Sequence, residues 1–225
     1  MEEKNEKFSI DTENLKNETV ETAKKVKESM KETNIKEETK ATKGFITEMF
    51  KNPLEKIKEV ANDDSGKFFK TAIFLIIAWM ILIFIDSARY TIYYYGFSRI
   101  FSELLDTLKL MIAPVIGILV YSIIVLIYNK NKKPLTTIIS TVTITQLPLI
   151  IAKLADLLKI ISTRLSTVTT PFASICSIVA IVLGYFGFKN LFKEDNDKVF
   201  IKKYIFIQII YYVAYILIGL LEIYI

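Results

Sequence analysis

The chain has 225 residues, of which 52% are hydrophobic and 12% aromatic, and its lysines and arginines outnumber its acidic residues by 29 to 24. It contains no histidine and one cysteine, which excludes the commonest general base, the commonest metal ligand, a disulfide framework and a thiolate metal cluster. The positive charges of residues 45–225 lie mainly in short segments between apolar runs, so the composition favours a membrane protein and argues against nucleic acid as a partner.

Residues 1–44 form a charged tail that holds ten lysines and eleven acidic residues. Its few apolar side chains cannot bury enough surface to offset backbone ordering, which costs about 1–2 kcal/mol per residue. We expect a mobile or weakly helical cytoplasmic tail. Two roles remain open for it: a solvated spacer, or an amphipathic segment that binds a protein partner.

Residues 45–66 are predicted to form two amphipathic juxtamembrane helices. Apolar residues recur there at a spacing of three or four: Ile46, Met49, Phe50, Leu54, Ile57 and Val60. Lysines 51, 56 and 58 lie elsewhere on these helices. The segment could lie in the cytoplasmic headgroup layer, or it could pack on the protein's own loops.

A helix start is predicted inside this segment. Asn52 is a good N-cap residue, Pro53 is tolerated at the first helical position, and Glu55 would complete a capping box. The sequence therefore predicts two helices that meet at Asn52, the second ending near Ala61. Asp64 or Ser65 is expected to cap the helix that follows.

Residues 67–225 contain five apolar runs, at about 68–86, 110–128, 135–152, 172–188 and 204–225. Eighteen residues of helix measure about 27 Å, close to the hydrocarbon thickness of about 30 Å. We therefore predict an all-α, polytopic transmembrane bundle of about five spans.

The third run is the most polar of the five. It contains a stripe made of Thr136, Ser140, Thr143, Gln146 and Pro148. The stripe could line an aqueous path, or its side chains could form hydrogen bonds between helices and support a kink at the proline. A re-entrant segment would have a similar sequence, so we leave open whether this run crosses the bilayer.

The fourth run has small residues on one helical face: Ala173, Ser177, Ala180, Gly184 and Gly187. Small side chains let a second helix approach closely. The sequence predicts a helix-packing face here, against either another span of the same chain or a second copy.

Orientation follows from counting lysine and arginine beside the spans. The side that includes the N-terminus has thirteen such residues and the opposite side has six. Because cytoplasmic loops are enriched in these residues, we expect a multi-pass protein of the plasma membrane with a cytoplasmic N-terminus and an outside C-terminus.

Chemistry in the membrane usually needs ionisable groups there. Asp86, Lys109 and Lys153 all lie at span ends, and none of the five runs has a charged residue near its middle. We therefore expect no catalytic residues, no metal site and no cofactor.

Two stretches resemble bacterial Yip1-domain membrane proteins: NPLEKIKEVANDDSGKFFKTA at 52–72 and TTIISTVTITQLPLIIA at 136–152. The resemblance extends over residues 45–225 and implies five spans. Many bacterial relatives begin with a zinc ribbon, but this chain lacks its cysteines, so metal binding is not implied. Eukaryotic relatives are associated with membrane traffic and small GTPases, and a shared fold alone does not transfer that role.

The sequence thus favours a non-enzymatic, membrane-organising or scaffold protein, with a small-solute permease or channel component as the alternative. The partners we expect are the lipid bilayer, a protein bound through the cytoplasmic tail, and a second copy of the chain.

Overall fold

The structure is a computed structural model that describes residues 17, 19–25, 27, 35–97, 103–129 and 133–224, with only the backbone described at 35, 104, 105, 160, 163 and 218–224. These residues form helices and turns, and none of them lies in a β-strand, so the all-α prediction is confirmed. In order, the helices are α2 (Ile35–Lys51), α3 (Pro53–Ala61), α4 (Phe69–Tyr95), α5 (Leu104–Ile127), α6 (Leu135–Thr145), α7 (Leu147–Asp156), the 3-10 turns η2 (Leu157–Ile160) and η3 (Thr163–Leu165), α8 (Ser166–Phe192) and α9 (Asp197–Tyr224).

Four of these helices, α4, α5, α8 and α9, are long and apolar enough to cross a bilayer. The chain is therefore an integral, multi-pass membrane protein. The helices are longer than the predicted apolar runs because they continue into the membrane interface. Helix α4, for example, has 27 residues and ends at Tyr95. The tyrosines at 90 and 93–95 are exposed there, as an interfacial aromatic belt requires.

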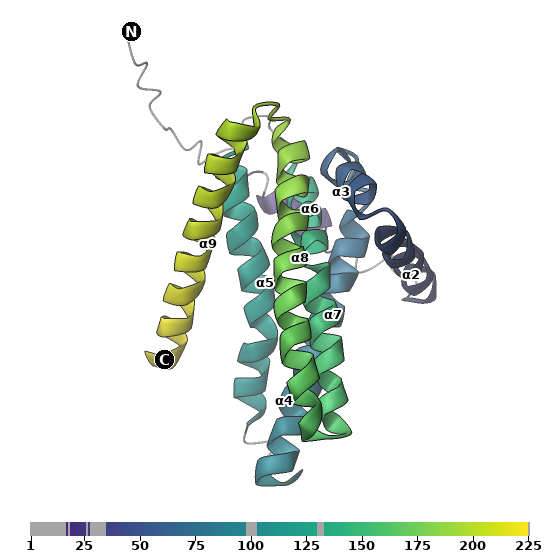
Figure 1. The fold of residues 1–225 in the computed structure, drawn as a ribbon, viewed down its shortest axis with the longest axis vertical. Coiled ribbons are helices and arrows are strands. Elements are labelled where there is room, and N and C mark those ends of the chain that lie inside the picture. Colours follow the sequence, from purple (N-terminus) through teal and green to yellow (C-terminus); the bar gives the residue numbers. More distant parts are fainter. Residues whose placement is uncertain are drawn as a thin grey trace.

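The third span is broken. Its two parts, Leu135–Thr145 and Leu147–Lys159, meet at a bend of 42°. Pro148 lies in the first turn of α7, where its missing N–H leaves no helical hydrogen bond unmade, so the break at Gln146 has a local cause. Figure 1 shows α6 and α7 stacked end to end beside α8, along the length of the bundle. Counted as one span, the two parts make a fifth crossing.

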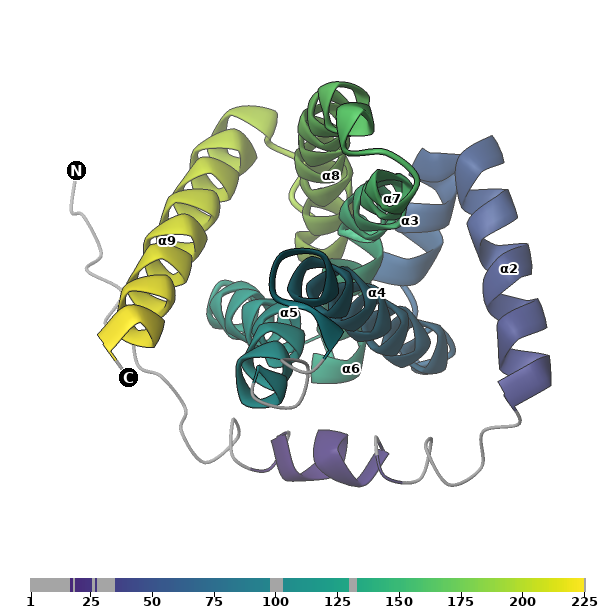
Figure 2. The same cartoon turned by 90° about the horizontal axis from the view of Figure 1, so that it is seen from below.

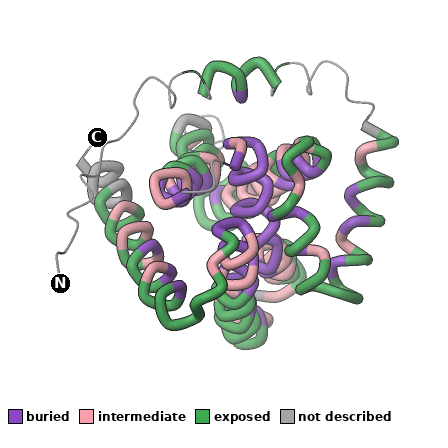
Figure 3. The backbone as a smooth tube through the Cα atoms, turned by 90° about the horizontal axis from the view of Figure 1, so that it is seen from above, coloured by how far each residue is buried: buried purple, intermediate pink, exposed green. Residues whose placement is uncertain are grey.

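Helix α6 forms the centre of the bundle. All eleven of its residues are buried, and it contacts α3, α4, α5 and α8. Figure 3 shows the buried residues gathered at the centre of the bundle, with exposed faces around them. The tightly packed core therefore lies at the end of the bundle where α3 and α6 are found.

Two helices lie on opposite flanks of the central group, α2 on one side and α9 on the other (Figure 2). In α9, Phe200, Tyr204 and Ile207 are buried, whereas most residues from Ile209 to Leu217 are exposed or half-buried. The first part of α9 thus packs most deeply on the bundle, and Tyr211 further along still contacts α5. The exposed aliphatic side chains beyond it suit contact with lipid.

The predicted boundary at residue 44 lies inside α2, which begins at Ile35. Thr42, Phe45 and Met49 are buried and lie on one face of the helix, and α2 contacts α3 and α4. This tertiary contact supplies the apolar burial that residues 35–44 lack on their own.

Candidate functional site

The polar stripe of the third span is mostly a packing feature. The hydroxyl of Ser140 donates to the carbonyl of Thr136 at 2.7 Å, and Thr141 and Thr145 likewise donate to carbonyls within α6. Thr143 is fully buried and lines no cavity. The hydroxyls of Ser140, Thr141 and Thr145 are satisfied by their own helix and need no water path, whereas the buried Thr143 hydroxyl has no hydrogen-bond partner among the described contacts.

Gln146 differs from the rest of the stripe. It lies at the break between α6 and α7, is half-buried, and faces a cavity of about 680 Å³. This volume falls within the range of small-molecule sites, about 300–1,000 Å³. Residues of α4, α5, α7, α8 and α9 line the cavity, so all five crossings contribute to it.

One end of the cavity holds three charged residues. The Asp86 carboxylate on α4 accepts a hydrogen bond from the Lys153 ammonium on α7, and its other oxygen accepts bonds of 3.0 and 3.3 Å from the Arg89 guanidinium. The side chains of Asp86, Arg89 and Lys153 are only 21%, 23% and 27% exposed. This cluster links the first and third spans through residues 67 positions apart.

The other end of the cavity is lined by aromatic and amide side chains. Gln208 on α9 donates to the hydroxyl of Tyr121 on α5, and the Tyr121 ring stacks on Tyr211 with centroids 4.2 Å apart. Tyr121 is itself buried in the larger of the two hydrophobic clusters.

The small residues of the fourth span pack inside the chain. A Cβ atom on Gly187 would lie 3.1 Å from the Cγ2 atoms of both Thr141 and Thr145, and one on Gly184 would lie 2.8 Å from the Tyr204 hydroxyl. Gly187 therefore admits α6, and Gly184 admits α9. Ala180 and Ser177 line the cavity, and Ala173 is half-buried.

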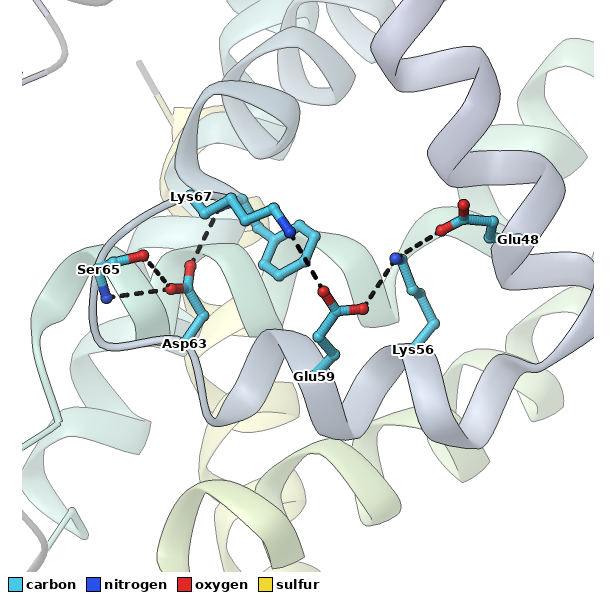
Figure 4. Close-up of polar contacts among 7 residues, drawn as sticks. Glu48, Lys56, Glu59, Asp63, Ser65 and Lys67 are labelled. Atoms are coloured by element: carbon cyan, nitrogen blue, oxygen red, sulfur yellow. Dashed lines mark hydrogen bonds and ion pairs between the residues drawn. The ribbon is translucent and has the colours of Figure 1, made fainter.

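A second feature lies at the N-terminal end, where α2, α3 and α4 meet around Lys56. The Lys56 ammonium lies 2.6 Å from Glu48 on α2 and 2.8 Å from Glu59 on α3 (Figure 4). It also lies 5.5 Å from the ring centroids of both Phe45 and Phe68. With its side chain only 14% exposed, Lys56 acts as a pin between the helices and does not face headgroups.

The charges around this pin shift each other's titration. Partial burial disfavours the Lys56 ammonium, but its hydrogen bonds to Glu48 and Glu59 outweigh that effect and raise the pKa of Lys56. The hydrogen bond from Lys56 lowers the pKa of Glu59, against a smaller opposing effect of burial. Both groups therefore stay charged over the physiological range.

The apolar face of α3 packs on the protein itself. Ile57, Val60 and Ala61 are almost fully buried, and α3 contacts α6 and α8. Of the two placements left open for this segment, the structure supports packing on the chain's own helices. Two apolar side chains at the elbow, the junction of α2 and α3, remain exposed: Phe50 by 67% and Leu54 by 48%.

The predicted start of α3 is correct in position but lacks the predicted capping bonds, and the predicted cap of α4 is wrong. The two helices do meet at Asn52, and Pro53 begins α3, but no side-chain capping bond is made, so the capping box of Asn52 and Glu55 is absent. At α4, neither Asp64 nor Ser65 is the cap. Asp63 instead accepts a 3.2 Å hydrogen bond from the Phe68 N–H (Figure 4).

Asp64 has another partner. Its carboxylate lies 2.7 Å from the ammonium of Lys133, a buried residue just before α6. The Thr137 hydroxyl donates to the Asp63 carbonyl at 2.5 Å. Together these contacts fix the α3–α4 turn against the start of the central helix, so this turn is attached to the core.

Among the residues that the structure describes, no three histidine, cysteine or acidic side chains are grouped closely enough to hold a metal ion. Comparison of the chain with protein-family models, with curated proteins and with solved structures found no match. The resemblance to Yip1-domain proteins therefore stays a prediction.

Sequence reasoning missed two of the features described above. It treated Asp86 and Lys153 as separate span-end charges, and it assigned Lys56 to a cationic face. A relevant pattern was present in both cases: an acid and a base at the same predicted membrane edge, and a lysine flanked by glutamates and phenylalanines.

Proposed function

We propose that this protein is a non-enzymatic scaffold of the bacterial cell membrane, which presents a rigid helical platform to a partner on the cytoplasmic side. The platform comprises α2 and α3 together with the turn to α4. The observation that supports this most is the Lys56 pin, because its ion pair with Glu48 and its ring contacts with Phe45 and Phe68 join α3 to α2 and to the turn before α4 and hold α3 in one direction. A flexible tether would not need it.

The platform also offers a surface for binding. Phe50 and Leu54 are exposed beside the elbow, next to the charged Lys51 and Glu55. Apolar side chains surrounded by charges are typical of protein-binding sites. The residues before α2 would extend this platform or tether it.

The test is in-cell cross-linking with mass spectrometry on three forms: the full chain, a chain lacking residues 1–34, and a Phe50→Ser, Leu54→Ser variant. We expect the same partner from the first two forms and its loss from the third. Thr47→Ser, on the exposed surface of α2, is the matched control. A full chain that captures only copies of itself, or a partner unaffected by the double substitution, would refute the platform as the binding surface.

The proposed orientation has its own test. Phe97, after α4, and Asp195, between α8 and α9, are exposed and lie at opposite ends of the bundle. With Cys176→Ser as background, an impermeant maleimide should label Phe97→Cys in intact cells and should label Asp195→Cys only after the cells are opened. Labelling of Asp195→Cys in intact cells would reverse the topology.

A small-solute permease is the second candidate, favoured by the cavity that reaches Gln146. Transport would require a path past the stacked rings of Tyr121 and Tyr211, which line the cavity. In proteoliposomes, a transported solute should lose its flux in Gln146→Leu and keep it in Thr143→Val, since only Gln146 lines the cavity. Equal flux in both variants and the native chain would exclude this route.

A further inference from the structure

The charged end of the cavity carries an excess of positive charge. Arg89 and Lys153 share a single carboxylate, that of Asp86, and all three side chains are more than two-thirds buried. Two other cations at this end have acids of their own: Lys109 pairs with Asp106 and Lys159 with Asp156. A partly buried cation in excess is unfavourable unless an anion approaches it.

The donors needed to hold such an anion are present. A guanidinium has five N–H groups and an ammonium three. Among the described contacts, Arg89 gives two to Asp86 and Lys153 gives one. Both residues line the cavity, so their remaining donors are available to a group bound there. Arginine in particular matches the oxygens of phosphate and carboxylate groups.

The rest of the cavity suits a hydrocarbon chain. Its walls include Ile83 on α4, Leu110 and Ile118 on α5, Leu149 on α7 and Ile181 on α8. Along α4 the lining runs from Arg89 back to Trp79, about 15 Å at a rise of about 1.5 Å per residue. The cavity is therefore elongated along the helix axes, with its charged group at one end.

This arrangement matches the position of a lipid in a bilayer. Asp86 lies about 25 Å along α4 from its first residue, near the edge of an apolar layer about 30 Å thick. A headgroup at the charged cluster would thus be at the membrane surface, and a chain running toward Trp79 and Tyr121 would be in the apolar layer. The stacked rings of Tyr121 and Tyr211 would line the far part of the path of this hydrocarbon chain.

We propose that the cavity binds an anionic amphiphile from the bilayer, with its acidic headgroup on Arg89 and Lys153 and its hydrocarbon chain along the apolar wall. This site is separate from the α2–α3 platform, and the inference does not rest on the scaffold function. It requires neither a protein partner nor any flux through the membrane.

The sole tryptophan of the chain, Trp79, lines this cavity and provides the measurement. The full-length protein is reconstituted in phosphatidylcholine vesicles that contain a small fraction of phosphatidylglycerol with brominated acyl chains, which quench tryptophan on contact. Brominated phosphatidylcholine replaces it in a parallel series. The ratio of the two quenching curves gives the preference for the anionic lipid at Trp79.

We expect a preference of about tenfold for phosphatidylglycerol, equivalent to about 1.4 kcal/mol. It should fall to near unity in Arg89→Gln, Lys153→Gln and stay unchanged in Lys109→Gln, the matched control, whose side chain is 61% exposed at the same end of the bundle and outside the cavity. Asp86→Asn should raise the preference about threefold, because it frees both cations. That gain is expected even if the double variant folds poorly.

Three results would overturn the proposal. The first is equal quenching by both brominated lipids in the native chain. The second is a preference that survives in folded Arg89→Gln, Lys153→Gln or falls in Asp86→Asn. The third is relief of quenching by inorganic phosphate in the buffer, because a free anion would then be the ligand and the hydrocarbon chain of the lipid would contribute nothing to binding.

Discussion

The contact between Tyr204 and Gly184 gives a prediction about stability. Whether Tyr204→Phe stabilises or destabilises the protein depends on what lies against the Tyr204 hydroxyl oxygen. The Tyr204 hydroxyl of α9 donates to the Ile181 carbonyl of α8 at 2.5 Å, over the space that Gly184 leaves empty. A Cβ atom on Gly184 would lie 2.8 Å from that hydroxyl, and the next nearest atom of the ring would be 3.8 Å away. Gly184→Ala therefore collides with the hydroxyl alone.

The magnitude for Gly184→Ala follows from two opposing effects. Overpacking a filled site costs about 1–3 kcal/mol, whereas alanine in place of glycine in a helix gains about 1 kcal/mol. We expect Gly184→Ala to lower stability by about 1 kcal/mol. In the native background Tyr204→Phe should also cost about 1 kcal/mol, for the lost hydrogen bond. In the Gly184→Ala background it should instead be stabilising, because it removes the colliding atom.

The assay is thermal unfolding of the purified protein in detergent, followed by circular dichroism. At about 2–4 °C per kcal/mol, each effect shifts Tm measurably. Gly117→Ala is the control, since its Cβ would lie at an ordinary 3.5 Å from the Tyr211 hydroxyl, and it should raise Tm. If Tyr204→Phe lowers Tm equally in both backgrounds, α9 does not pack on α8 as described.

Three further predictions concern the core, the elbow and the charged cluster. Gly187→Ala should lower Tm, because its Cβ would lie 3.1 Å from two threonine methyl groups. Adding Thr141→Ser and Thr145→Ser removes both methyl groups and should restore Tm. The absence of any rescue would contradict this contact. The pKa of Glu59 is lowered in the folded protein, so its contribution to stability is complete above the usual glutamate value of 4.5 and is lost as the pH falls through the lowered value. Because Glu59 pairs with Lys56 within α3, thermal unfolding should give a Tm that falls as the pH is lowered through that range, and Glu59→Gln should remove this part of the pH dependence; an unchanged pH dependence in Glu59→Gln would count against the contact. Finally, Asp86→Ala should cost about 2 kcal/mol and lower Tm more than Lys153→Ala, which leaves Asp86 paired with Arg89; the opposite order in thermal unfolding would contradict the shared carboxylate.

Sequence reasoning was sufficient for features that depend on neighbours in the chain. Hydrophobic runs gave the all-α class and the crossings, and the Asn52-Pro53 pair gave the place where α2 and α3 meet. Pro148 indicated a kink in the third span, and small residues in the fourth indicated a packing face. Each of these follows from local propensity or helical period, which a sequence displays directly.

Tertiary structure decided what each of those features contacts. Gly187 faces the chain's own α6. Of the polar stripe, only Gln146, at the break beside Pro148, faces the cavity, while the threonines are buried in the core. Lys56 became a pin because α2 folds back on α3, and Asp86 met Lys153 across 67 residues because the first and third spans pack together. These pairings depend on how each helix is rotated about its axis and on where the third span bends. Both are set by packing among all the helices at once, so no single segment of the sequence contains them.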